Sequence, residues 1–340
     1  MRRIALLLTS LFLALLLAEM LIRLLQVAPE VGFIKKDQFR LSPNPNIGYE
    51  PIPSLRVSNA SVSEIHRYNG VTNKMGFRDE DYDKEKPSGT KRIIILGDSI
   101  AAGQRIPHTR DIFPSIVEKR LNKKIPPIEV LNFGVIGYNT QQEVETLIDK
   151  GIDFNPDLVV LAYCLNDRRR DDGSLYQQLL ERRKEMGILD KLEISPHLSK
   201  SALYRWIKYH LLDQLHQKKI DQISQNTVRD YFERLSDVSI EHKFDVLVCV
   251  FPYLREIDAK EKAYPYQHLH EDVKKISEQN KFHHLDLLHT FRSCKDRQPK
   301  ERLALDKIHP TALGHQCAAE TISDTILKNI WNNIQNPKPS

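Results

Sequence analysis

A serine, a histidine and an aspartate occur in the sequence where they can act together. Ser99 follows an apolar run in the stretch IIILGDSIAAG, and Asp306 and His309 lie near the C-terminal end in LALDKIHPTALGH. A serine hydroxyl is a weak nucleophile that needs a neighbouring base, and an imidazole suits that role near neutral pH. Asp306 can accept a hydrogen bond from the second ring nitrogen and so hold the tautomer. These residue types point to a serine nucleophile.

Donors for the oxyanion of an acyl-transfer intermediate are also present. We expect them to be the backbone N–H groups of Ser99 and of Gly134, in VLNFGVIGYNT, and the side-chain amide of Asn166, in CLND. Losing one such donor typically costs about 3–4 kcal/mol of transition-state stabilisation. A glycine at position 134 lets the backbone approach a substrate closely, because it has no side chain.

Each of these residues also has a simpler interpretation. Ser99 can cap the helix that follows it, and Gly134 and Asn166 are common turn residues. Asp98 is a conceivable phosphoryl acceptor, but no Walker-type loop or pair of metal-binding carboxylates accompanies it. We expect Asp98 to hold the turn by hydrogen bonds, and only the joint pattern favours serine chemistry.

Alternating apolar and amphipathic segments predict the scaffold that positions these residues. Strand candidates are residues 92–96, 128–133, 157–163, 245–251 and, more weakly, 283–288; helical patterns lie near 112–121, 141–150, 227–242 and 266–279, and after 311. This order predicts a three-layer α/β domain with a mainly parallel sheet, in which ligands bind at the carboxyl ends of the strands. Residues 171–225 are polar and helical, and too long for an ordinary connection, so we expect a helical insertion or lid there.

The order and types of the site residues resemble those of the SGNH hydrolases, also called the GDSL family of esterases and lipases. Ser99 matches the nucleophile of that family, Gly134 and Asn166 its oxyanion donors, and Asp306 and His309 its D-x-x-H block. The resemblance covers about residues 92–327 apart from the insertion. It implies a flavodoxin-like sheet of five parallel strands and an acyl-enzyme mechanism that needs no metal or cofactor.

The N-terminus reads MRRIALLLTSLFLALLLAEMLIRLL, with two arginines before an apolar run. A run of about 20 residues just spans a bilayer core of roughly 30 Å. Sites for signal cleavage are poor, so an uncleaved anchor is favoured over a cleaved signal peptide and secretion. The arginines place the rest of the chain outside the cytoplasm, in the periplasm if the host is Gram-negative. Glu19 and Arg23 leave a surface-lying helix as a further alternative.

Composition and segment boundaries predict three parts: an anchor or signal peptide over residues 1–28, a linker with a small β-rich prelude over 29–90, and the hydrolase domain over 91–335. The 340 residues, 41% of them apolar, suffice for a substantial core. The net charge is +5, and charged residues of both signs are spread along the chain. No basic motif predicts nucleic-acid binding. Four cysteines show no metal-binding C-x-x-C pair; a Cys294–Cys317 disulfide stays open, as does the oligomeric state.

We therefore expect a serine esterase that hydrolyses O-acyl esters, preferably O-acetyl groups of an extracytoplasmic polysaccharide. The membrane anchor favours this substrate, and NFGVIGYNT resembles bacterial family members linked to envelope polysaccharides. Cleavage of lipid or phospholipid esters and acyl transfer to a second sugar would use the same residues. A non-catalytic module that binds envelope glycan is the alternative outside enzymes.

Overall fold

The structure, a computed structural model, divides the chain into two compact units: Met1–Phe33 with Gln178–Ile223, and Ile34–Gln177 with Ser224–Ser340. It describes residues 2–25, 39–57 without 43, 45 and 48, 70–167 without 126, 201–207, and 225–331 without 255, 256 and 258–263. Most of the predicted insertion at 171–225 lies outside the described residues.

The first unit contains an apolar N-terminal helix. Helix α1 (Arg2–Leu25) includes Ala5–Leu25, which is long and apolar enough to cross a membrane, with a mean hydropathy of 2.4. The two charged residues that interrupt its apolar sequence form an ion pair one turn apart, with 2.6 Å between Arg23 Nε and Glu19 Oε1. The Glu19 carboxylate also accepts the first N–H groups of helix α6 (Ala202–Ile207). Both charges within the apolar run are therefore partnered inside this unit.

The second unit is built on a five-stranded sheet in the order β6-β5-β7-β8-β9, and all four pairings are parallel. Its strands are β5 (Lys91–Gly97), β6 (Ile128–Asn132), β7 (Leu158–Cys164), β8 (Asp245–Phe251) and β9 (His283–Asp286). The predicted strands and the predicted parallel sheet are confirmed. The weak apolar run at 283–288 is a strand only as far as Asp286.

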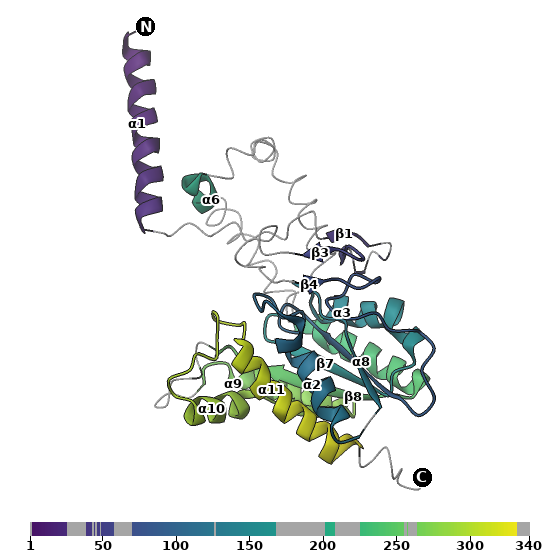
Figure 1. Cartoon of the computed structure of the whole chain (residues 1–340). Helices are drawn as coiled ribbons and strands as arrows, with labels where there is room; N and C mark the ends of the chain where they lie inside the picture. The colour runs from purple at the N-terminus through teal and green to yellow at the C-terminus, as the bar shows by residue number, and fades with distance from the viewer. Residues whose placement is uncertain are drawn as a thin grey trace. The chain divides into compact units, whose positions relative to one another are not determined.

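Helices cover both faces of the sheet and make three layers (Figure 1). Side chains alternate along a strand, so Ile94 and Leu96 join one apolar cluster while Ile93 and Ile95 join the other. The first cluster takes in α3 (Thr140–Thr146), α8 (Gln225–His242) and α9 (Gln267–Gln279); the second takes in α2 (Phe113–Asn122), α10 (Leu288–Arg297) and α11 (Ala312–Thr325). The sequence analysis did not separate α10 from the strand before it. Short helical turns span Thr109–Asp111, Leu147–Gly151, Ile152–Phe154 and Ile326–Trp331.

The residues before β5 form two small hairpins that pack into the same unit. Strand β1 (Phe39–Leu41) pairs with β2 (Tyr49–Pro51), and β3 (Arg56–Val57) pairs with β4 (Gly70–Val71), both antiparallel. Tyr49 is buried in the first apolar cluster, and its hydroxyl donates a hydrogen bond of 2.7 Å to the carbonyl of Ile136. This β-rich segment therefore shares a core with the sheet.

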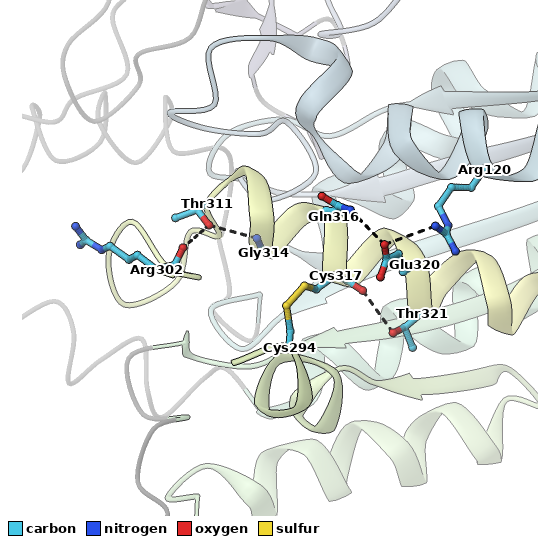
Figure 2. The surroundings of a disulfide bond; sticks show 9 residues. All are labelled: Arg120, Cys294, Arg302, Thr311, Gly314, Gln316, Cys317, Glu320 and Thr321. Atoms are coloured by element: carbon cyan, nitrogen blue, oxygen red, sulfur yellow. Dashed lines mark hydrogen bonds and ion pairs between the residues drawn. A yellow bond between two sulfur atoms is a disulfide. The ribbon is translucent and has the colours of Figure 1, made fainter. Parts of the chain in front are cut away.

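A disulfide joins two helices that pack in the second apolar cluster. Figure 2 shows Cys294 of α10 bonded to Cys317 of α11, which closes a loop of 23 residues. The sequence left this pairing open, and the structure decides it. Asp306 and His309 both lie between the two cysteines in the chain. The disulfide therefore restrains the segment that carries the predicted base.

Candidate active site

The turn that carries the predicted nucleophile, Ser99, begins where β5 ends. The side chain of Asp98 is fully buried, and its carboxylate accepts hydrogen bonds from the backbone N–H of Ile100 at 2.8 Å and from Asn166 Nδ2 at 3.0 Å. Burial raises the pKa of Asp98, against the effect of these donors. Asp98 thus holds the turn, as expected, and ties the predicted oxyanion residue Asn166 to the predicted nucleophile Ser99.

The three residues predicted to act on the ester lie in one line of hydrogen bonds. Ser99 Oγ is 2.9 Å from His309 Nε2, and His309 Nδ1 is 2.8 Å from Asp306 Oδ2. Asp306 Oδ1 also accepts the backbone N–H groups of Ile308 and His309 at 2.9 Å each. Partial burial would raise the pKa of Asp306, but these hydrogen bonds hold it well below its usual range. An ionised Asp306 selects the tautomer in which His309 Nδ1 carries the proton and Nε2 can accept one from Ser99.

Backbone hydrogen bonds fix the loop that presents the histidine. The Leu305 N–H donates to the carbonyl of His309, and the Leu254 N–H donates to the carbonyl of Lys307, at 2.8 and 2.7 Å. Thr311 then caps helix α11, its hydroxyl accepting the N–H of Gly314. The predicted base therefore lies on a turn that is hydrogen-bonded to the segment after β8 and is followed by a capped helix.

Two arginines that the sequence analysis missed support this site. Arg105 Nη1 lies 2.9 Å from Asp306 Oδ2, so it joins the loop after Ser99 to the loop that carries Asp306. The buried guanidinium of Arg78 donates to the carbonyls of Ala102, Gly103 and Ile106, at 3.0, 2.7 and 2.6 Å. Neither residue lies in a segment with helical or strand periodicity, so no local signal marks them.

The three predicted oxyanion donors differ in whether their N–H groups already donate a hydrogen bond within the protein. Within the described part of the chain, nothing accepts a hydrogen bond from the Ser99 N–H. Asn166 Nδ2 donates one of its two hydrogens to Asp98, and no described residue accepts the second. The Gly134 N–H donates to Asn132 Oδ1 at 3.0 Å, so it must share or exchange this partner to bind an oxyanion. The part played by Gly134 stays a prediction.

The structure shows a second reason why position 134 requires a glycine: a side chain there would not fit. A Cβ there would lie 2.5 Å from the backbone nitrogen of Ala102 and 2.6 Å from Ala101 Cβ, closer than real contacts allow. The absence of a side chain at Gly134 therefore lets the loop after β6 pack against Ala101 and Ala102, in the loop after Ser99. It would also let the backbone of Gly134 approach a substrate.

Two further buried carboxyl groups lie behind the site. Asp167 accepts the N–H of Cys164 at 2.6 Å, and Glu143 comes from helix α3. Burial, reinforced by the charges of neighbouring carboxylates, raises the pKa of both well above the usual range. Among the described residues, no group of three or more His, Cys, Asp or Glu is arranged to hold a metal ion.

The comparison with protein families agrees with this geometry. Residues 95–317 match the GDSL-like Lipase/Acylhydrolase family. The chain belongs to this family. As a GDSL-family protein with this sheet, it is an enzyme that hydrolyses ester bonds. No curated protein matches the chain.

Several solved structures are similar to this GDSL-family chain at low identity. The acetyl xylan esterase AlAXEase is 16% identical over 69% of this chain and 99% of its own, with a TM-score of 0.44. TesA is 14% identical over 69% and 98%, with a TM-score of 0.44. A lipolytic G-D-S-L protein from Veillonella parvula DSM 2008 is 14% identical over 70% and 99%, with a TM-score of 0.43. The substrate must therefore be inferred from this chain's own residues.

Proposed function

We propose that this enzyme is a serine esterase with Ser99 as its nucleophile, His309 as its general base and Asp306 as the residue that orients the base. The observation that carries the proposal is the continuous hydrogen-bonded line from Ser99 Oγ through the imidazole of His309 to the Asp306 carboxylate. A serine that merely capped a helix would need no imidazole at its hydroxyl and no carboxylate behind that imidazole.

The proposed reaction has two halves. Ser99 Oγ attacks the ester carbonyl carbon while His309 Nε2 takes the hydroxyl proton, and the carbonyl oxygen becomes an oxyanion. The Ser99 N–H and the second N–H of Asn166 Nδ2 bind this oxyanion, with the Gly134 N–H joining when it is released from Asn132. The tetrahedral intermediate then expels the alcohol, which His309 protonates. Water, deprotonated by His309, attacks the acyl-enzyme and frees the acid.

We further propose that the ester is an O-acyl group, foremost an acetyl group, on a polysaccharide outside the cytoplasm. Helix α1 supports a location at a membrane, and the arginines at its short N-terminal end favour an extracytoplasmic catalytic unit. The Cys294–Cys317 disulfide also suits an oxidising compartment. Transfer of the acyl group to another sugar would use the same first half-reaction, with a sugar hydroxyl in place of water.

Hydrolysis of 4-nitrophenyl acetate by the full chain tests the mechanism. We expect Ser99→Ala to lower kcat by about 10³-fold or more, because the covalent step is lost. A fluorophosphonate should label the wild-type chain at Ser99 and leave Ser99→Ala unlabelled. Ser236→Ala, a change of the same type on helix α8, is the matched control and should behave as wild type. Full activity or labelling in Ser99→Ala would refute the proposal.

A further inference from the structure

A cavity of about 400 Å³ lies beside the acid of the proposed triad. It combines apolar side chains with basic ones and reaches Asp306 itself. Its lining residues are Leu254, Ile257, Leu303 and Ala304, the basic Lys295, Arg302 and Lys307, and Asp306. Pockets of about 300–1,000 Å³ are typical of small-ligand sites. The cavity therefore has room for one unit of a substrate beside Asp306.

The basic groups of this cavity are not neutralised by carboxylates within the described part of the chain. Lys295 Nζ donates to the carbonyl of Glu301 at 3.0 Å, and Arg302 Nη2 donates to the carbonyl of Leu305 at 2.8 Å. Lys307 Nζ donates to the hydroxyl of a tyrosine at 3.2 Å. Neutral acceptors satisfy hydrogen bonds but leave the positive charge in place.

The one carboxylate in the lining does not offset these charges. Asp306 already pairs with Arg105 and accepts hydrogen bonds from His309, so its charge is engaged within the proposed active site. By contrast, two basic side chains elsewhere in the unit, Lys86 and Lys91, share the carboxylate of Asp157. The cavity thus concentrates positive charge beside Asp306, the acid of the proposed triad, and would attract an anion.

Contacts with neighbouring residues hold the three basic residues of the cavity in place. Lys307 Nζ lies 4.5 Å from the ring centroid of Tyr253 and 5.2 Å from that of Tyr266, which fixes its direction. Figure 2 shows the carbonyl of Arg302 accepting the Thr311 hydroxyl, at 2.7 Å. Lys295 directly follows the disulfide-bonded Cys294. A site that is already ordered loses less entropy when it binds a ligand.

We propose that this cavity binds a sugar residue that carries a carboxylate, next to the acetylated position, so that the natural substrate is an acidic polysaccharide. This inference rests on the proposed esterase function and narrows its substrate class. The sugar carboxylate would meet Arg302, Lys295 and Lys307, and a C–H face of the ring would pack on Leu254 and Leu303. The acyl chain of a phospholipid would instead need an uncharged lining, because charged groups are costly to bury against hydrocarbon.

A matched pair of substrates tests the inference: methyl glycosides of O-acetylated galacturonic acid and of O-acetylated galactose, which differ by a carboxylate. For the wild-type full chain we expect kcat/KM to favour the acid by about tenfold or more, and the preference to shrink in 1 M salt. In the double variant Arg302→Gln, Lys307→Gln, the ratio of kcat/KM for the acidic substrate to kcat/KM for the neutral one should fall toward one. The ratio is measured within one protein, so it is insensitive to loss of folded enzyme. Lys123→Gln, an exposed change at the far end of helix α2, is the control and should keep the wild-type ratio.

A binding measurement separates this inference from the esterase mechanism. We expect trigalacturonate, followed by calorimetry with the Ser99→Ala chain, to bind at least tenfold more tightly than neutral trigalactose, whether or not any ester is turned over. Failure to hydrolyse 4-nitrophenyl acetate would refute the mechanism alone. Equal binding of the two trisaccharides would overturn the acidic-sugar site. Binding of monomeric dihexanoyl phosphatidylglycerol without binding of trigalacturonate would overturn it as well, because the recognised anion would then be a lipid headgroup.

Discussion

Replacing Arg78 with methionine is the sharpest test of how the β-rich segment supports the active site. Arg78 lies outside the sheet, yet its guanidinium reaches three carbonyls of the loop that follows Ser99. Methionine has a similar length and tolerates burial, but it donates no hydrogen bond. The variant therefore removes the brace and leaves most of the packing in place.

The expected loss follows from these contacts. A buried acceptor that loses its partner costs about 1–3 kcal/mol. The carbonyl of Gly103 keeps a second donor, the N–H of Ile106, whereas the Ala102 and Ile106 carbonyls depend more on Arg78. Relief from burying a charge offsets part of the loss. We expect a net destabilisation of about 2–4 kcal/mol and, because Ser99 would shift, a fall in kcat of about 10- to 100-fold.

Urea unfolding followed by circular dichroism gives the free energy, and 4-nitrophenyl acetate gives kcat at a urea concentration where the variant is still folded. Arg110→Met, which removes an arginine that is 80% exposed, is the matched control and should change the free energy by less than about 0.5 kcal/mol. A wild-type unfolding midpoint together with wild-type kcat in Arg78→Met would show that the brace is dispensable.

Two further predictions concern stability. Replacing Cys294 and Cys317 together with alanine should lower the free energy of unfolding by about 3 kcal/mol, because a loop of 23 residues is no longer closed in the unfolded chain; urea unfolding measures it, and reduced wild-type protein should match the variant. The second concerns acid stability. Burial, together with the charges of Arg78 and His309, lowers the pKa of His315 to about 3, while its Nδ1 accepts the N–H of Phe113. As pH falls below about 6.5, the unfolded chain takes up a proton that the folded chain refuses, so the wild type should lose up to about 5 kcal/mol by pH 3. His315→Asn keeps an acceptor near the Nδ1 position and should lose less over the same interval in unfolding experiments.

For both stability predictions, a specific experimental result would contradict the reasoning. An unchanged urea midpoint in the double alanine variant would mean that the disulfide does not restrain the loop of His309. Parallel loss of stability in wild type and His315→Asn between pH 7 and pH 4 would mean that other groups, and not His315, control acid unfolding.

The sequence by itself determined the scaffold and indicated the candidate residues for the chemistry. Strand and helix periodicities are local, so the strands and most helices could be placed from short segments. Ser99, Gly134 and Asn166 follow three such strands, and parallel strands bring their carboxyl ends to one edge. Helix α10 was missed because its start at Leu288 is separated from β9 by a single residue, so the apolar pattern runs through the boundary.

Only the tertiary structure decided the contacts that support and surround the proposed triad. Arg105 and Asp306 are 201 positions apart, and Arg78 reaches carbonyls up to 28 positions away, so no local pattern could pair them. The bond between Cys294 and Cys317 depends on how two helices pack on the same face of the sheet. The cavity beside Asp306 likewise exists only where the end of β8, helix α10 and the histidine loop meet. Residue types predict which groups can react, whereas long-range packing decides what holds them in place and which charges face a substrate.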